Sequence, residues 1–151
     1  MTAATVPART VAPDSFEVLV EEGLLCAALS SAIAVCIHGT VEEAGALLHL
    51  RFVVRPGRSA DVTDTTLAME LLLLDRCLAS LREAAPAARS LRARVVAHVP
   101  APIPRAACEA VLDLIGQFLR DQQVEVDAPD LAQGAPRQLA FRPGMGSLTV
   151  A

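Results

Sequence analysis

The chain has 151 residues, a net charge of −4 and a sequence pI near 5.3. This length is typical of one domain. The arginines are scattered rather than clustered, so neither nucleic acid nor an anionic membrane surface is an expected partner. Hydrophobic residues make up 53% of the chain but aromatic residues only 3%, which predicts an aliphatic core.

The longest apolar run, residues 23–37, is shorter than the roughly 18 to 20 residues of a membrane-spanning helix, and Ser30 and Ser31 interrupt it. Acidic residues, Glu21 and Glu22, precede this run where a signal peptide would carry basic ones. We therefore expect no membrane insertion and a cytoplasmic location.

The cysteines show neither CxxC nor HxxC spacing and have apolar neighbours. This pattern favours buried free thiols over a zinc site or a disulfide framework. The cysteines are Cys26, Cys36, Cys77 and Cys108.

In chain order, residues 1–14 are rich in Ala, Thr and Pro, which predicts a flexible leader before a domain at 15–151. Three apolar, partly β-branched runs then predict strands, and the second and third could form a hairpin. These runs are Phe16–Val20, Ile33–Ile37 and Ala46–Val54. Residues 55–60 predict a loop.

Two helices are predicted by leucine-rich stripes at intervals of three and four residues. The first begins after Asp61, with Asp61, Thr63 or Asp64 as a candidate cap, and the second follows Pro104. The first stripe contains Leu67, Leu71, Leu74, Leu78 and Leu81, and the second contains Cys108, Val111, Leu112, Ile115, Phe118 and Leu119.

The remaining strands are predicted at Leu91–Val99, Val124–Val126, Arg137–Phe141 and Ser147–Val150. The turn RPGMG joins the last two and is a hairpin signal. Strands mixed with two long helices predict a single-domain layered α/β (α+β mixed) sandwich, in which mixed sheets are flanked by the helices.

Taken alone, the residues give little support for chemistry. His49 lies in an apolar strand, where the simplest interpretation is a core histidine bonded to backbone. His38 is interpreted as a turn residue and His98 as the end of a strand. The sequence contains no glycine-rich phosphate loop, paired carboxylates or serine hydrolase elbow, and no cofactor is expected.

A family resemblance adds to this reading. LSSAIAVCI followed by GALLH resembles two motifs of the chemoreceptor glutamine deamidase (CheD) family, a Leu-Gly-Ser-Cys-Val-Ala-Val-Cys-like run and Gly-Ala-Met-x-His. SADVTDTTLAMELL, LRARVV and the part from Ile103 to Val150 resemble later segments of that family, including an Asp and an Arg at Asp130 and Arg137. The resemblance covers about residues 16–150.

The resemblance implies a CheD-like fold and a relation to enzymes that convert receptor glutamines to glutamates with a Cys nucleophile, a His base and a Thr that orients the His. His49 falls on the base position. The nucleophile position falls on Ala32, and the Thr position falls on Cys26. A methyl group cannot attack an amide carbon, so the chain is expected to lack activity. It would act by binding a chemoreceptor or a CheC-type phosphatase.

Other departures point the same way. The family's Gly-Gly-Ala after the strand at 91–96 is replaced by Ala97, His98 and Val99. Larger side chains at these positions should narrow or close the cleft.

Two alternatives stay open. One is an active deamidase with a displaced nucleophile, Cys26 or Ser31, acting with His49. The other is an ordinary deamidase whose native Cys at position 32 has been replaced by Ala.

Overall fold

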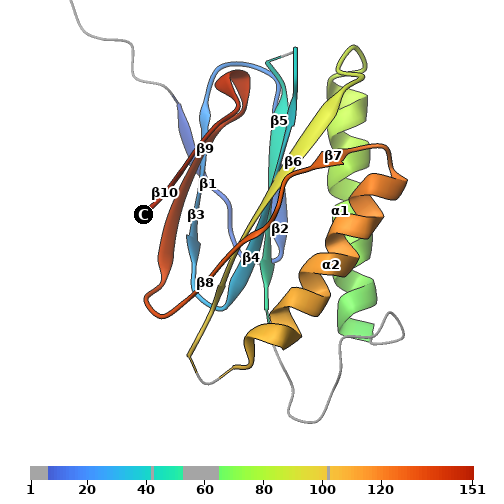
Figure 1. Ribbon diagram of the computed structural model, residues 1–151. Helices are drawn as coiled ribbons and strands as arrows, with labels where there is room; N and C mark the ends of the chain where they lie inside the picture. The colour runs from blue at the N-terminus through green and yellow to red at the C-terminus, as the bar shows by residue number, and fades with distance from the viewer. Residues whose placement is uncertain (1–6, 42, 53–64, 102) are drawn as a thin grey trace, which may run out of the picture.

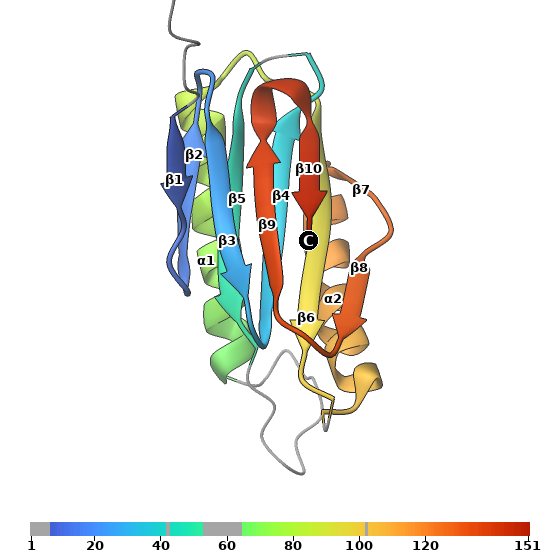
Figure 2. The ribbon, with the colours of Figure 1, turned by 90° about the vertical axis from the view of Figure 1, so that its left-hand side faces the viewer.

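The computed structural model describes residues 7–41, 43–52, 65–101 and 103–151. Within these ranges, ten strands and two α-helices form one α+β domain, which confirms the predicted fold class. Two β-sheets face each other, and both helices cover the outer face of the larger sheet (Figure 1). Seen from the side, the small sheet lies in front of the larger one, with the helices behind (Figure 2).

The small sheet has the strand order β1-β3-β9-β10. Its strands are β1 (Ala8–Thr10), β3 (Leu24–Leu29), β9 (Arg137–Arg142) and β10 (Ser147–Val150). The large sheet has the order β2-β5-β4-β6-β7, and β8 also pairs with β6. Its strands are β2 (Ser15–Leu19), β4 (Ala32–Gly39), β5 (Gly45–Arg51), β6 (Leu91–Val99), β7 (Glu125–Val126) and β8 (Asp130–Gln133).

Both predicted hairpins are present. β4 and β5 are antiparallel neighbours in the centre of the large sheet, and β9 and β10 are antiparallel neighbours in the small one. A short 3₁₀ helix, η1 (Pro143–Met145), joins β9 and β10. Gly146 follows it with φ of 59°, a left-handed conformation that glycine adopts without steric cost.

The helices α1 (Thr65–Ala84) and α2 (Arg105–Asp121) bury the stripes that the sequence predicts. Leu74, Leu78 and Leu81 are fully or almost fully buried in α1, as are Ile115 and Leu119 in α2. The candidate caps at 61–64 lie outside the described residues. No helix in the described part of the chain is long and apolar enough to cross a membrane.

The predicted leader is wrong for residues 7–14. Residues 8–10 form β1, which pairs in parallel with β3, and Val11 is 1% exposed in the layer between the sheets. The backbone N–H of Val11 donates to the carbonyl of Cys26 over 2.8 Å. Composition alone indicated a mobile segment, whereas long-range backbone pairing and one buried valine fix this segment in place.

Two further strands were not predicted. β3 was interpreted as part of a continuous apolar run, but its residues alternate, with Leu25, Ala27 and Leu29 buried and the intervening residues more exposed. β8 is only four residues long and pairs with the edge of β6. Such short segments carry weak periodicity.

Candidate functional site

Position 32 begins β4, in the middle of the large sheet. Ala32 lies opposite Arg51 of β5 and opposite His98 of β6. Its side chain belongs to the apolar cluster between the two sheets and is 1% exposed. The residue at the nucleophile position is therefore a buried methyl group.

His49 lies on the same side of the sheet, one strand away. It pairs with Ala34, so that Ala32 is its diagonal neighbour, and diagonal neighbours on one face have Cα atoms about 7 to 8 Å apart. We call the side chains of Ala32, Ala34, His49 and His98, which face the small sheet, the Ala32 face. The structure thus brings the predicted base and the predicted nucleophile position together.

The ring of His49 is held by backbone. It is 3% exposed, and Nδ1 lies 2.9 Å from the carbonyl oxygen of Val11. Because a carbonyl can only accept, Nδ1 carries the proton and donates, which leaves Nε2 of the neutral ring as the acceptor. The interpretation of His49 as a core histidine bonded to backbone is confirmed, and its tautomer is also the one that a general base needs.

Cys26 lies on the other sheet and points the other way. In β3 the side chains of Leu25 and Ala27 enter the layer between the sheets, so Cys26 between them faces outward. The side chain of Cys26 therefore does not lie beside His49. Cys26 is in place neither to orient the His49 ring nor to act with it as a displaced nucleophile. The carbonyl of Val11 occupies the orienting role instead.

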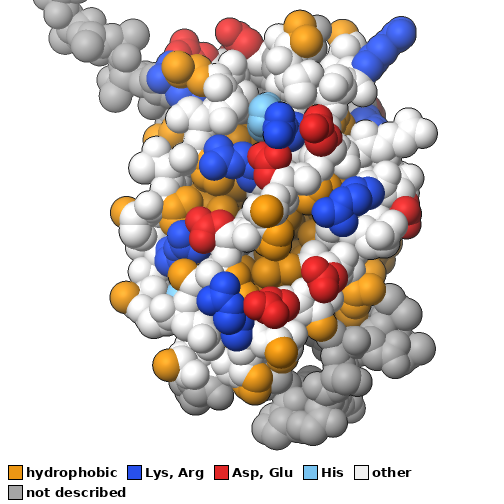
Figure 3. All heavy atoms as spheres, viewed as in Figure 1, with side chains coloured by type: hydrophobic (Ala, Val, Ile, Leu, Met, Phe, Trp, Pro, Cys, Tyr) orange, Lys and Arg blue, Asp and Glu red, His pale blue; other side chains and the backbone are white. Residues whose placement is uncertain are grey.

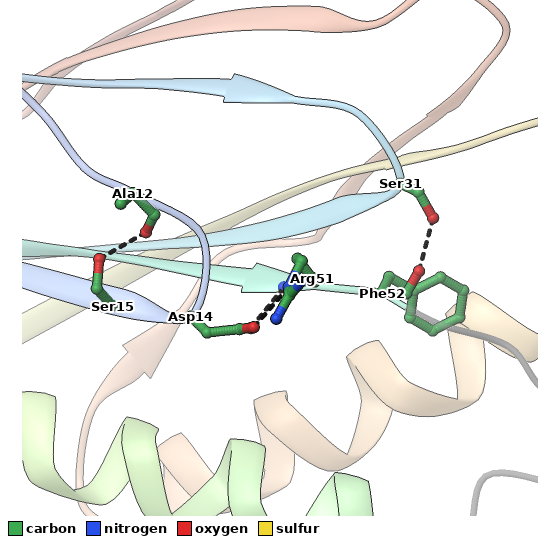
Figure 4. A network of polar contacts seen from close by, with 6 residues as sticks. All are labelled: Ala12, Asp14, Ser15, Ser31, Arg51 and Phe52. Atoms are coloured by element: carbon green, nitrogen blue, oxygen red, sulfur yellow. Dashed lines mark hydrogen bonds and ion pairs between the residues drawn. The ribbon is translucent and has the colours of Figure 1, made fainter.

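Ser31 belongs to the turn before β4, with φ of 49°. Its hydroxyl donates to the carbonyl of Phe52 over 2.6 Å, and the N–H of Phe52 donates back to the Ser31 carbonyl over 2.8 Å. Figure 4 shows this contact, together with the ion pair of Asp14 and Arg51 at the end of β5. The Ser31 hydroxyl is therefore bonded to backbone and not to His49.

His98 occupies the opposite flank of Ala32. It is 2% exposed, and its Nδ1 and Nε2 lie 3.0 Å from the Ser31 nitrogen and 2.7 Å from the Gly134 carbonyl oxygen. The predicted end-of-strand position is confirmed, since His98 is the second-last residue of β6. His98 is the residue of β6 that pairs with Ala32. His38, predicted in a turn, instead lies near the end of β4, with its ring centroid 6.2 Å from that of Phe141.

Asp130 and Arg137 form a bidentate ion pair beside β6. The guanidinium nitrogens lie 3.0 and 2.9 Å from the two carboxylate oxygens, and the Arg137 side chain is 16% exposed. The hydrogen bond from Arg137 lowers the pKa of Asp130 from its usual value, against the opposing effect of partial burial. This pair ties β8 to β9.

Burial makes three of the four thiols unreactive, because it raises their pKa values. Cys36 lies on the same side of β4 as Ala32 and is a diagonal neighbour of His49. Burial raises its pKa far above the usual value, so it stays protonated at neutral pH. Burial also raises the pKa of Cys77 to about 12 and that of Cys108 to about 11. These three cysteines confirm the predicted buried free thiols, whereas Cys26 is half-buried.

On the Ala32 face the base, His49, lies beside a methyl group, and the two side chains are 3% and 1% exposed. Two cavities of about 470 and 610 Å³ lie elsewhere, one between β5 and α1 and one between the ends of the two helices. The face that carries β6, β8 and α2 shows apolar side chains among arginines and carboxylates (Figure 3). No cluster of three or more potential metal ligands occurs within the residues that the structure describes.

Sequence reasoning missed two backbone groups that fix this arrangement, the carbonyls of Val11 and Gly134. Val11 belonged to the presumed leader, although its β-branched side chain between Thr10 and Ala12 was a weak strand signal. Gly134 adopts φ of 115°, which accounts for a glycine there but does not predict what its carbonyl contacts.

Comparison with known protein families and with curated proteins gives no match to this chain.

Proposed function

We propose that the chain is a CheD-like chemotaxis protein of the bacterial cytoplasm that binds a chemoreceptor or a CheC-type phosphatase and does not deamidate glutamine. The observation that carries the proposal is the buried Ala32 beside His49. The spacing of the two positions matches the resemblance, and the strand register makes them neighbours on one face. Without a thiolate at that place, no acyl-enzyme can form.

Burial supports the loss of activity independently. A substrate carboxamide would have to reach Ala32 and His49, which are 1% and 3% exposed. Leu25, Ala27 and Phe141 of the small sheet pack on this part of the large sheet, and the Val11 carbonyl contacts the ring of His49. A binding role needs no access to that layer.

The test combines two measurements on the unmodified chain. A purified cytoplasmic fragment of a chemoreceptor is incubated with the protein, and ammonia release is measured together with mass spectrometry of the receptor glutamines. Binding is measured by titration calorimetry with the same fragment, and separately with a CheC-type phosphatase. We expect binding to one of these partners and no ammonia.

The matched variant is Cys26→Ala, which changes a side chain on the outer side of β3. It should leave binding unchanged and should release no more ammonia than the unmodified protein. Ammonia release by the unmodified chain would contradict the inactive role, and binding to neither partner would contradict the chemotaxis role.

An active deamidase with Cys replaced at position 32 remains a second candidate because the tautomer of His49 suits a base. The Ala32→Cys variant decides between the two. We expect no recovery of deamidation, since the new thiol would lie beside the bonded ring of His98 in a layer closed to substrate. Recovery of ammonia release in Ala32→Cys, with none in the double variant Ala32→Cys/His49→Gln, would favour the second candidate.

A further inference from the structure

The ring of His98 connects two turns that are far apart in the sequence. Ser31 lies 67 positions before it and Gly134 lies 36 positions after it. The Ser31 group is an N–H, which can only donate, and the Gly134 group is a carbonyl, which can only accept. The ring must therefore be neutral, with its proton on Nε2.

The two contacts respond differently when the ring gains a second proton. A protonated imidazole has a donor on both nitrogens, so it still donates from Nε2 to the Gly134 carbonyl. At Nδ1, however, the new N–H would point at the N–H of Ser31. One contact is kept and the other is replaced by two opposed donors.

Ser31 depends on such outside contacts. A non-glycine residue with φ of 49° lies in a sparsely populated region and persists where its surroundings hold it. Three bonds hold it here, two with Phe52 and one with His98. Because Ser31 directly precedes Ala32, loss of the His98 bond loosens the start of β4.

The charged groups around His98 come from four strands. Arg94 lies on β6 on the same side of the sheet, and Asp130 and Arg137 approach from β8 and β9 as an ion pair. Beyond Ala32, β5 contributes His49 and Arg51, the latter paired with Asp14.

The neighbouring elements add little to this set. No charged side chain comes from Ala32, which pairs with His98 on β4, or from the residues of β3 and β10. Most of the nearby charges are therefore paired with each other, and the fate of the Ser31 contact follows chiefly from the proton on Nδ1.

We propose that His98 is a pH-sensitive tie: its neutral form holds the turn at Ser31 against β6, and protonation releases that turn while the contact with Gly134 remains. Protonation of His98 thereby loosens the start of β4 at the β3–β4 turn, beside Ala32. This inference stands without the proposed function.

Nuclear magnetic resonance of the full, ¹⁵N-labelled chain tests the proposal. At pH 8, long-range ¹⁵N–¹H spectra of the His98 ring should show the proton on Nε2. On titration to pH 5, hydrogen-exchange protection of the Ser31 amide, corrected for the intrinsic pH dependence, should fall at least tenfold with the same midpoint as the His98 ring signals. The amides of β8 should keep their protection.

Two variants serve as controls. His98→Gln offers an acceptor and a donor without titrating, so protection at Ser31 should no longer change with pH. His38→Gln removes a histidine at the other end of β4 and should leave the titration of Ser31 intact.

A proton on Nδ1 at pH 8 would overturn the proposal, as would a Ser31 amide whose protection does not follow the ring. Equal loss of protection in β8 would indicate general acid unfolding and would also overturn it. All three outcomes are read from the unmodified protein, so the proposal is tested even where a variant folds poorly.

Discussion

The two faces of the large sheet are built from different side chains, although they share the same strands. β4 shows the contrast within one segment, because alternate residues of a strand point to opposite faces. Toward the helices it presents large branched residues and toward the small sheet smaller ones. The first set is Ile33, Val35 and Ile37, and the second is Ala32, Ala34 and Cys36.

The difference teaches how the protein accommodates polar groups in its interior. On the helix face, aliphatic side chains fill the space and no buried histidine is present among the described residues. On the Ala32 face, small side chains leave room for two imidazole rings, and each ring nitrogen with a described contact meets a backbone group. Buried polar atoms are tolerated when they are bonded in this way.

The largest expected contrast concerns the thiols. Cys26 faces outward, whereas Cys36, Cys77 and Cys108 are buried and keep their protons. With a maleimide at pH 7, Cys26 should react on mixing. The other three should react on the order of a thousandfold more slowly, because they must wait for the protein to open.

Mass spectrometry of the labelled peptides gives the rates. The Cys26→Ala variant should lose the fast phase and keep the slow one. Fast labelling of Cys36 would mean that the Ala32 face is open at neutral pH, and the contrast between its two faces would have to be revised.

On the helix face, Leu78→Ala should lower the free energy of unfolding by about 2 to 5 kcal/mol, the usual range for a buried leucine. Leu78 is 1% exposed between α1 and the large sheet. Urea unfolding measures the change. Met69→Ala on the same helix, at a side chain 61% exposed, is the control and should change stability by less than about 0.5 kcal/mol.

On the Ala32 face, His98→Leu should lower the free energy of unfolding by about 1 to 3 kcal/mol, because an apolar side chain leaves the part-buried N–H of Ser31 without its partner. The loss should arise from the missing hydrogen bond rather than from lost volume. His98→Gln, which keeps polar atoms, should therefore cost less in the same urea experiment. An equal cost for both variants would show that shape, not bonding, decides this position.

The smallest effect is expected at the Asp130–Arg137 pair. The Asp130 side chain is 55% exposed, so Asp130→Asn should cost below about 1 kcal/mol at pH 7. The pKa of Asp130 is lowered in the folded protein. Ionised Asp130 therefore contributes fully to the free energy of unfolding above the unfolded-state pKa of about 4. This contribution is lost as the pH falls through the lower pKa of the folded state.

Urea midpoints of Asp130→Asn and of the unmodified protein should accordingly converge between pH 6 and pH 3. Glu109→Gln, which removes the exposed pair with Arg105 on α2, is the matched control. A difference for Asp130→Asn that grows on acidification would contradict the assigned direction of the shift.

Local pattern in the sequence determined much of this protein. The stripes of α1 and α2, the β4–β5 and β9–β10 hairpins and the strand at 91–99 were all predicted, because helical and strand periodicity are properties of neighbouring residues. The same reasoning placed His49 in an apolar strand and bonded it to backbone.

Tertiary structure alone decided the rest. That Val11 orients His49, that Cys26 faces away from it, and that His98 joins Ser31 to Gly134 depend on contacts between segments that lie far apart in the chain. Sequence periodicity gives the side of a strand on which a residue lies, but not which strand or which carbonyl faces it. Those partners are chosen when the two sheets pack and their buried polar groups must all be bonded.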